Sequence, residues 1–476
     1  MAQAEAPTRR SEFVILHLGL GNFHRAHQAV YLQQLIDTGD NRWSISGANL
    51  RPDMPEVIAA LRAQGGRYTL ETISPAGDHR YQTIESIREV LPYEPGHAPL
   101  IARGADPATR IISFTVTEAG YYLDPKDKLD LSFADLKADL ERAKRGEPGT
   151  TIYGGVCAIL RARRAADAGP VTLLNCDNLR HNGERFRAGL LEFIELVGDK
   201  PLLEWVQANT TCPNAMVDRI TPRPPPELRE RVKKATGQDD GASISGESFI
   251  QWVIEDSFLA GRPEWEKVGV QLVDSVQPYE EAKIRLLNAT HSCIAWAGTL
   301  IGLSFIHEST QTPAIRQMAF DYVTDDAIPC LDKPGAPSPV DLPAYRDVVL
   351  ERFSNPAIRD TNQRVAMDGF SKIPGMIAPT IHERHARGES FDSVAMLPAL
   401  FLAFLQRWHK GELLYTYQDQ SMDEAVAHAI CDDADPVKAF ASNRSLWGAL
   451  AGDAKLVEAL RKAHQRVLEF VQTSKS

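Results

Sequence analysis

The segment FVILHLGLGNFHRAHQ, residues 13–28, decides the fold because a short apolar run leads directly into a glycine turn. The run 13–18 is typical of a buried β-strand, and a helix is expected to begin just after the turn. Glycines in such a turn let the backbone approach a dinucleotide pyrophosphate, whose charge the free N–H groups of the helix start would bind. Gly19, Gly21, Asn22 and Phe23 are the candidate contacts. Because His24 replaces the usual third glycine, an ordinary βα turn remains an alternative.

The first half of the chain alternates strand-like and helix-like segments. Strands are predicted at 13–18, 43–48, 68–72, 110–115 and 171–174, and helices at 26–37, 54–63, 133–145, 152–165 and 184–197. Such alternation is typical of a parallel sheet with helical crossovers.

The second half of the chain reads as consecutive helices. From about Glu281 the helical segments include 282–300, 313–323, 393–408 and 457–471, and the Pro-rich stretches 221–226 and 329–343 are predicted to be long surface loops. The sequence therefore predicts an α/β Rossmann-type dinucleotide-binding domain over residues 11–280. A mostly α-helical substrate domain follows over residues 281–476.

Composition argues against several classes of protein. Lys and Arg total 52 against 63 Asp and Glu, a net charge of −11, which gives no electrostatic reason to bind nucleic acid or an anionic membrane. The 6 cysteines show no CxxC pair, so neither a disulfide framework nor a structural zinc site is expected. Residues 1–12 lack the apolar stretch of a secretory signal and are expected to be disordered. The longest apolar runs, 293–306 and 395–405, are shorter than the ~18 residues of a membrane span, so the protein is expected to be soluble and cytoplasmic.

The residues after the second predicted strand bear on the choice of dinucleotide. A carboxylate at Asp53 would accept hydrogen bonds from ribose hydroxyls and favour NAD, whereas Arg51 would favour the 2′-phosphate of NADP. Asp53 could equally be a helix N-terminal carboxylate that complements the dipole ahead of Met54.

A second chemical signal lies where the all-helical half begins. On an α-helix, Lys283, Asn288, His291 and Glu280 would lie at about 0°, 140°, 80° and 60°, on one arc. A solvated helix face would show the same pattern, but the continuation of this helix is apolar nearly all round, which favours a buried cleft. A lysine can act as the base that takes a hydroxyl proton, and an amide can donate to the developing alkoxide.

Tyr279 and Lys283 also match YxxxK, the catalytic pair of short-chain dehydrogenases. Those chains are about half this length, carry a TGxxxGxG turn and place a serine about a dozen residues before the tyrosine. Here Lys267 lies twelve positions earlier and no such turn is present, so the match is interpreted as coincidental.

Four segments together resemble the polyol-specific long-chain dehydrogenases, the mannitol dehydrogenase family. They are HLGLGNFHRAHQ (17–28), LLNCDNLRHNG (173–183), NAMVDRITP (214–222) and the pattern K-x4-N-x2-H that begins at Lys283, and TNQRVAMDGFSKIP (361–374) extends the likeness toward the C-terminus. GDNRWSI, AQGGRYTLETISP, FTVTEAGYYL and IPCL are most similar to bacterial members that act on D-arabinitol. The resemblance implies a cofactor bound to the N-terminal domain and a substrate held against the helical one, with no metal.

The resemblance also implies a role for each matching residue. Lys283 would be the general base, Asn178 and Asn288 the donors to the oxyanion, and His291 a ligand of a substrate hydroxyl. Asp218, Arg364 and Lys372 would line the polyol pocket, and Glu280 would lie on a proton path from Lys283 to solvent.

The residues alone leave other interpretations open. Asn178 could hold a turn or cap the helix predicted near Glu184. Cys176, Asp177 and His181 could be zinc ligands, although no second cluster at ligand spacing supports this. Asp218 could pair with Arg219, and Arg364 with Asp360 one helical turn earlier. His24 and His27 are expected to support the glycine turn.

The expected activity is oxidation of D-arabinitol at C4 to D-xylulose with NAD, by a monomer or weak homo-oligomer. The alternatives are oxidation of D-mannitol to D-fructose, a broad range that includes D-sorbitol, and use of NADP. A sugar-phosphate substrate held by Arg364 and Lys372, or a nucleotide-binding protein without catalysis, would fit the sequence less well.

Overall fold

The computed structural model describes residues 11–124 and 126–474, so most of the N-terminal segment expected to be disordered lies outside the described residues. The chain divides into two compact units. The first contains the residues up to Ile73 and His79–Gln277, and the second contains Ser74–Asp78 and the chain from Pro278 onward.

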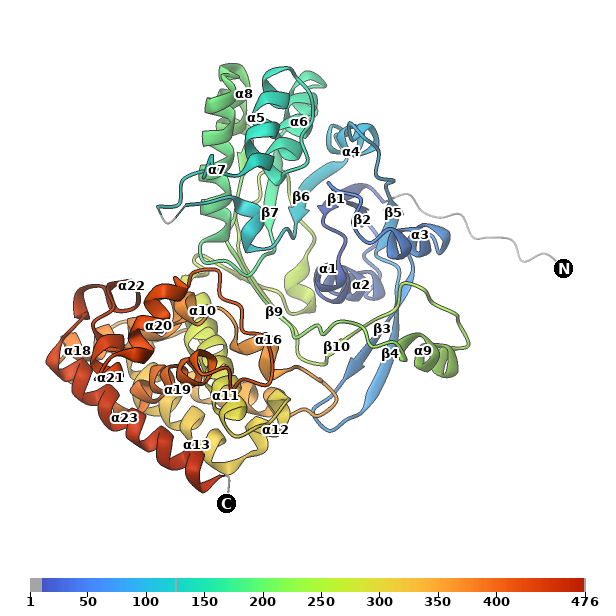
Figure 1. Ribbon diagram of the computed structural model, residues 1–476. Helices are drawn as coiled ribbons and strands as arrows, with labels where there is room; N and C mark the ends of the chain where they lie inside the picture. The colour runs from blue at the N-terminus through green and yellow to red at the C-terminus, as the bar shows by residue number, and fades with distance from the viewer. Residues whose placement is uncertain (1–10, 125, 475–476) are drawn as a thin grey trace. The chain divides into compact units, whose positions relative to one another are not determined.

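The first unit is built on a six-stranded sheet in which all neighbouring strands are parallel (Figure 1). Its order is β5-β2-β1-β6-β7-β8, the strand order of a dinucleotide-binding Rossmann fold. The strands are β1 (Phe13–Leu18), β2 (Trp43–Ala48), β5 (Ile87–Val90), β6 (Thr109–Phe114), β7 (Val171–Asn175) and β8 (Thr210–Thr211). The predicted fold class is therefore confirmed, with the strand at 13–18 at the centre of the sheet.

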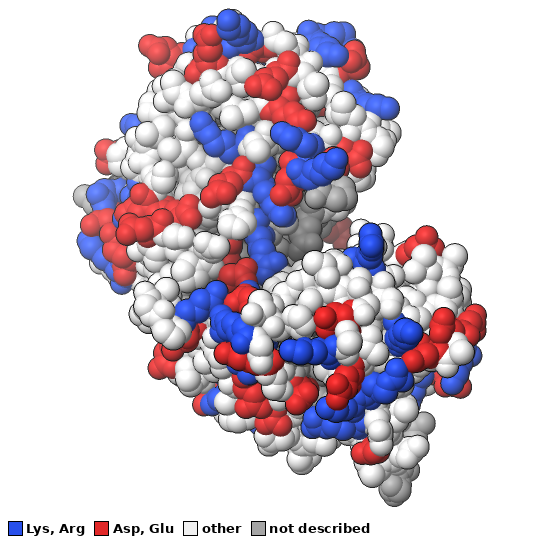
Figure 2. Space-filling view, turned by 90° about the vertical axis from the view of Figure 1, so that its left-hand side faces the viewer, with Lys and Arg blue, Asp and Glu red and all other residues white. Residues whose placement is uncertain are grey.

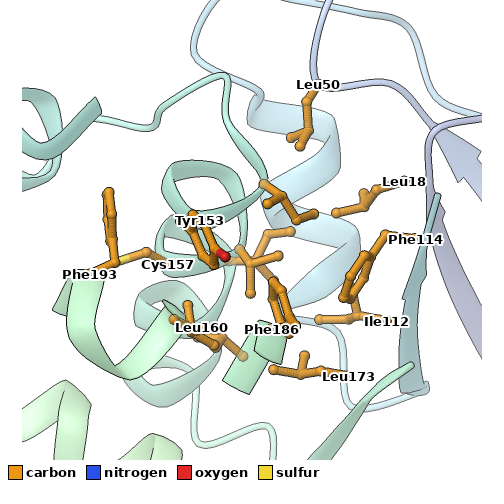
Figure 3. Close-up of a cluster of buried hydrophobic side chains, with 14 of the residues drawn as sticks. Leu18, Leu50, Ile112, Phe114, Tyr153, Cys157, Leu160, Leu173, Phe186 and Phe193 are labelled. Atoms are coloured by element: carbon orange, nitrogen blue, oxygen red, sulfur yellow. The ribbon is translucent and has the colours of Figure 1, made fainter. Parts of the chain in front are cut away.

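Both faces of this sheet are buried, because successive residues of a strand point to opposite sides. Leu16 and Leu18 of β1 belong to one core cluster, and Ile15 belongs to the other. In the first cluster, Phe114, Tyr153 and Phe186 meet between the sheet and the helices beside it (Figure 3). The helices of this region are α1 (Asn22–Ala26), α2 (Gln28–Asp37), α3 (Pro55–Ala63), α4 (Ala98–Gly104), α5 (Ala134–Lys144), α6 (Ile152–Ala165), α7 (Asn182–Val197) and α8 (Lys200–Asn209).

Two three-stranded sheets complete the first unit, and they correct one prediction. The strand predicted at 68–72 is β3 (Tyr68–Ile73), but it pairs with β4 (His79–Ile84) and β10 (Ile244–Glu247) outside the large sheet. Antiparallel pairing with β4 gives it other partners, which strand propensity alone does not specify. The remaining elements are β9 (Ala215–Asp218), β11 (Gln251–Glu255), β12 (Gln271–Val273), α9 (Leu228–Thr236) and the 3₁₀ turns η1 (Glu118–Tyr121) and η2 (Trp265–Val268).

From Pro278 to Ser474 the second unit consists of helices joined by loops, with no β-strand among these residues. Its central helix, α11 (Ala289–Leu300), is buried all round and packs against α16 (Asn362–Ala366) and α19 (Asp392–His409). The other helices are α10 (Gln277–Ala282), α12 (Ile306–Gln311), α13 (Pro313–Asp321), α14 (Ile328–Leu331), α15 (Leu342–Phe353), α17 (Gly369–Lys372), α18 (Ala378–Ala386), α20 (Glu424–Asp432), α21 (Pro436–Ala441), α22 (Arg444–Trp447) and α23 (Ala454–Thr473). Three π-helical segments, η3 (Lys283–Asn288), η4 (Tyr322–Ala327) and η5 (Ile373–Ile377), and the 3₁₀ turn η6 (Gly448–Leu450) join them.

Two local predictions need correction. The helix predicted over 26–37 is interrupted at His27, where α1 ends and α2 begins. The loop predicted over 329–343 is shorter, because Pro329 lies in the first turn of α14 and Pro343 in the first turn of α15. Proline is accepted there because the first amides of a helix have no partner within it.

Candidate active site

The glycine turn follows β1 at the carboxyl edge of the large sheet, and its two glycines serve different ends. Gly19 has φ +95°, and a Cβ there would lie 2.2 Å from the carbonyl oxygen of Thr115, so the fold itself requires glycine. A Cβ on Gly21 would meet only the Gly19 oxygen, at 3.9 Å. The space beside Gly21 is therefore open to a ligand. Gly21 is also the N-cap of α1 and has no side chain to cap the helix, so the first amides of α1 are available to that ligand.

Buried histidines support the glycine turn through hydrogen bonds and ring stacking. His17 lies 2.8 Å from Ser113 Oγ through Nδ1 and 3.1 Å from the Gly19 oxygen through Nε2, and its ring stacks on His24 at 3.4 Å. Burial lowers the pKa of His17 to about 3 and holds the pKa of His24 well below its ordinary value. His27 lies 2.8 Å from the Gln251 oxygen through Nε2, so the histidines support the fold around the turn, as predicted.

A cavity of about 200 Å³ opens beside the end of β2. It is lined by Asn49, Arg51, Pro52, Asp53, Pro55, Ile58, Ala59, Arg62, Leu91, Pro92 and Tyr93. Asp53 is exposed and does not cap α3, whose N-cap is Met54. The Arg51 guanidinium is already engaged by the Tyr122 hydroxyl at 2.9 Å and by Asp135 at 3.0 Å. Asp53 and Arg51, the two residues expected to select between NAD and NADP, both line the cavity. Only the Arg51 head group is held there by other side chains, Tyr122 and Asp135.

Strained backbone marks the loops at this edge. Met54, Thr117 and His181 are non-glycine residues with φ of 49°, 67° and 50°, and they follow β2, β6 and β7. Each such conformation costs on the order of 1–3 kcal/mol and persists where the surroundings impose it, which is common at ligand sites.

The loop after β7 carries Asn178, which is exposed next to the buried Asp177. The Asp177 carboxylate accepts hydrogen bonds from the amides of Val116 and Thr117 at 3.0 Å and from the Tyr121 hydroxyl at 2.6 Å. Burial raises the pKa of Asp177, and these donors oppose the rise. Asp177 thus ties the loop of Asn178 to the loop after β6.

Two alternatives for this region can be compared with the structure. Asn178 is not the N-cap of α7, a position that His181 occupies. Cys176, Asp177 and His181 do not form a metal-binding group, and over 11–124 and 126–474 no three His, Cys, Asp or Glu side chains do so.

Asp218 ends β9 and is buried. Its neighbour Arg219 donates to the backbone oxygens of Glu247 and Ala26, at 2.6 and 2.5 Å. Arg219 is thereby fixed in the fold of the first unit.

In the second unit, Lys283 and Asn288 lie on one π-helical turn, η3. The prediction of a regular α-helix there is wrong, and the error matters. On an α-helix these residues would lie about 140° apart, whereas i→i−5 bonding brings residues five apart nearly one above the other. Lys283 is buried, and Glu280, also buried, precedes it on α10.

His291 follows on α11 and is enclosed. Its ring stacks on Phe353 at 4.2 Å with an interplanar angle of 17°, and its Nε2 lies 3.4 Å from Asp360 Oδ2. Burial lowers the pKa of His291, and the Asp360 charge opposes this. A neutral imidazole can both donate and accept hydrogen bonds.

Asp360 also binds Arg364, as the alternative interpretation of the sequence predicted. Arg364 donates through Nε at 2.6 Å and through Nη2 to the second carboxylate oxygen. His291 and Arg364 together hold the pKa of the Asp360 carboxyl well below its usual value, against the opposing effect of burial. Lys372 donates to the Val365 oxygen at 2.5 Å, and its charge is also felt at His291.

The structure therefore brings His291 and Arg364 to Asp360, and holds Lys372, bound to the Val365 oxygen, near enough for its charge to act on His291. Asp360 and Phe353 were not among the predicted site residues. For Asp360, the spacing D-x3-R at 360–364 was the available signal, because it places two opposite charges one helical turn apart. Phe353 carries no such signal, since an aromatic residue at helical spacing normally reads as core.

Two family profiles match consecutive parts of the chain. The profile of the mannitol dehydrogenase Rossmann domain matches residues 13–267, and that of the mannitol dehydrogenase C-terminal domain matches residues 275–468. The chain belongs to the mannitol dehydrogenase family and is a sugar-alcohol oxidoreductase.

Two similar members of the family are called D-arabinitol 4-dehydrogenase. The protein from Ralstonia nicotianae is 58% identical over 95% of this chain and 96% of its own length, and that from Klebsiella pneumoniae is 55% identical over 95% and 97%. A solved member, Pseudomonas fluorescens mannitol 2-dehydrogenase in a ternary complex with NAD and D-mannitol, is 34% identical with a TM-score of 0.82. That comparison covers 98% of this chain and 94% of the other.

Two further observations concern the charge of the surface and the apolarity of the helices. Acidic and basic side chains are interspersed over the face in view in Figure 2, as the modest excess of acidic residues suggests. Within the part of the chain that the structure describes, none of the helices combines the length and apolarity needed to cross a membrane.

Proposed function

We propose that this protein is an NAD-dependent dehydrogenase that oxidises D-arabinitol at C4 to D-xylulose. The observation that carries the proposal is the 58% identity, over nearly the full length of both chains, to a protein called D-arabinitol 4-dehydrogenase. Lys283, Asn288 and His291, which the proposed chemistry requires, lie on one buried helical segment.

The first unit fits a dinucleotide. Its strand order reverses beside β1, where the open side of Gly21 and the start of α1 would receive the pyrophosphate of NAD, with Asn22 and Phe23 beside it. The cavity after β2 would receive the adenosine, and Asp53 would accept hydrogen bonds from the ribose hydroxyls. A carboxylate there repels a 2′-phosphate, which supports NAD over NADP.

Alcohol oxidation needs a base for the hydroxyl proton. When bound, NAD supplies the acceptor for the hydride that leaves the substrate carbon. Lys283 is the proposed base: it is buried, and burial disfavours an ammonium relative to a neutral amine that can accept a proton. Glu280, one turn earlier, would pass that proton to solvent.

The developing alkoxide needs uncharged donors. Asn288, brought next to Lys283 by the π turn, donates its amide N–H, and Asn178 is the proposed second donor. Because amides supply this stabilisation, the proposed mechanism uses no metal.

The rest of the polyol needs hydrogen bonds to its hydroxyls. His291 is neutral and fixed between Phe353 and Asp360, so it can donate and accept at a set position. Arg364, Lys372 and Asp218 are the proposed further contacts with the polyol.

The test is a steady-state assay of D-arabinitol, D-mannitol and D-sorbitol with NAD and with NADP at mildly alkaline pH. D-arabinitol with NAD is expected to give the highest kcat/KM, with D-xylulose as product. Absence of turnover on all three polyols would refute the proposal.

The base is tested by Lys283→Ala, which should lower kcat far more than it changes affinity for NAD. Lys462→Ala is the matched control, because Lys462 lies on α23 in an exposed pair with Glu458. Near-normal turnover of Lys283→Ala would refute its assignment as the base.

Oxidation of D-mannitol at C2 is the second candidate, favoured by the likeness to the P. fluorescens enzyme. A higher kcat/KM for D-mannitol than for D-arabinitol would select it. The proposed monomer or weak homo-oligomer is tested separately by a mass measurement in solution.

A further inference from the structure

The π turn that carries Lys283 differs from the other two π segments in its origin. In η4 the last π bond runs from Ile328 N to Val323 O, and in η5 from Ala378 N to Ile373 O. The next residue in each case is a proline, Pro329 or Pro379, which has no N–H to donate. The missing amide leaves a carbonyl without a helix donor at both places even in α-helical bonding, so these two π segments lie at a break in the helix ladder that proline itself causes.

The segment η3 contains no proline, and its last π bond runs from Ala289 N to Ile284 O. When the helix returns to i→i−4 bonding, the next amide, that of Thr290, reaches Leu286 O. The carbonyl of Arg285 is therefore passed over. A buried carbonyl without a donor is costly, so an external donor is needed to keep the π turn.

The Tyr322 hydroxyl is that donor. It lies 2.8 Å from the Arg285 oxygen, and the Tyr322 side chain is fully buried. Burial raises the pKa of this phenol, which keeps the hydroxyl protonated and able to donate. The Arg285 side chain is fixed as well, through Glu383 at 2.6 Å and Glu281 at 3.1 Å.

From this arrangement we infer that Tyr322 is a positioning residue: its hydroxyl holds the π register of η3 and thereby aligns Lys283 with Asn288. The inference rests on the proposed function, in which Lys283 is the base and Asn288 an oxyanion donor. Without the hydroxyl, the buried Arg285 oxygen has no donor and the π turn is destabilised. In regular α-helical bonding Lys283 and Asn288 would instead lie about 140° apart around the helix.

The experiment compares Tyr322→Phe with the parent enzyme. A misplacement of about 1 Å can cost on the order of 10²-fold in rate, so kcat should fall about 10- to 100-fold. The KM for NAD should be unchanged, because the proposed nucleotide site belongs to the first unit. The pH profile of kcat should shift with the environment of Lys283, and amide hydrogen exchange in a peptide covering 283–290 should accelerate.

Tyr415→Phe is the matched control. Tyr415 also contacts this helix through a hydroxyl, which lies 2.8 Å from Thr299 Oγ1 near the far end of α11. Its loss should leave kcat and exchange at 283–290 unchanged.

A second variant covers the case in which Tyr322→Phe does not fold. Replacing Tyr322 by 4-aminophenylalanine supplies an N–H donor in place of the hydroxyl that contacts the Arg285 oxygen. This variant should restore folding, kcat and slow exchange. Failure of this variant to restore them would overturn the inference. So would a folded Tyr322→Phe protein that keeps full kcat, or one that loses kcat while exchange at 283–290 is unchanged.

The outcomes separate the inference from the proposed function. If Lys283→Ala abolishes turnover but Tyr322→Phe does not change it, only the inference fails. If the parent enzyme oxidises no polyol, the proposed function fails, whereas hydrogen exchange still reports whether Tyr322 holds the π turn.

Discussion

Replacing Asp360 by Asn tests whether this carboxylate organises the proposed substrate side chains. The substitution keeps the shape and one acceptor oxygen but removes the charge. In the structure that charge faces His291 Nε2 at 3.4 Å and binds two N–H groups of Arg364.

The size of the effect follows from burial. Asp360 is 7% exposed, whereas the Arg364 side chain is 65% exposed, so water can replace part of what Arg364 loses. Breaking a fully buried pair costs about 3–5 kcal/mol, and the exposure of Arg364 reduces this to about 2 kcal/mol. For a unit of this size we expect Tm to fall by about 4–8 °C.

The kinetic effect should be similar in free energy to the loss of stability. His291 and Arg364 each lose the contact that orients them toward the polyol. A hydrogen bond to a charged group contributes about 1.5–3 kcal/mol, so kcat/KM for D-arabinitol should fall about 10- to 100-fold, mainly through KM.

The assay is initial-rate NADH formation with varied D-arabinitol, together with fluorescence titration of NADH binding. Asp453→Asn is the control, because Asp453 also pairs with a histidine, His385, at 3.1 Å, and asparagine preserves its capping of α23. An Asp360→Asn enzyme with parental kcat/KM for D-arabinitol would refute the reasoning. A loss confined to NADH binding would refute it as well.

Three further predictions concern the first unit. Gly19→Ala should lower Tm, because its Cβ would lie 2.2 Å from a carbonyl oxygen at φ +95°, whereas Gly21→Ala should keep Tm and weaken NADH binding in fluorescence titration. An unchanged Tm for Gly19→Ala would contradict this account. Asp53→Ser should raise kcat/KM with NADP relative to NAD by about tenfold, about 1.4 kcal/mol, and an unchanged ratio would remove Asp53 from cofactor selection. His17 and His24 stay neutral when folded, because burial lowers the pKa of His17 to about 3 and that of His24 well below its ordinary value. Their stabilisation is therefore complete above about pH 6.5 and is lost as the pH falls below that value, by about 1.4 kcal/mol per pH unit for each histidine. Denaturant unfolding at pH 7.5 and 5.5 measures this loss, and equal stabilities would count against it.

Much of the first unit could be predicted because its signals are local. The predicted strands at 13–18 and 43–48 coincide with β1 and β2, and the helix at 152–165 coincides with α6. Apolar alternation and helical periodicity are patterns that can be recognised within a short window of sequence. The strand with which a given strand pairs cannot be recognised in such a window, which is why β3 was wrongly expected in the large sheet.

The site shows the same division. Asn288 and His291 follow Lys283 on one helix, so their position on a common segment could be predicted from the sequence. The π turn that brings Asn288 toward Lys283 could not. His291 and Asp360 meet only because α11 packs beside the segment that leads into α16. The periodicity of neither segment predicts that contact.

The sequence by itself determined a glycine turn after a buried strand, an all-helical second half and the residues able to do the chemistry. Those features depend on local backbone sterics and on residue type. Only the tertiary structure decided how Lys283 is presented, because the π turn leaves a carbonyl that the helix cannot satisfy, and the hydroxyl that satisfies it belongs to Tyr322 on another segment. A hydrogen bond between distant residues is a property of the packed chain, and in this protein it sets the register of the helix that carries the proposed base.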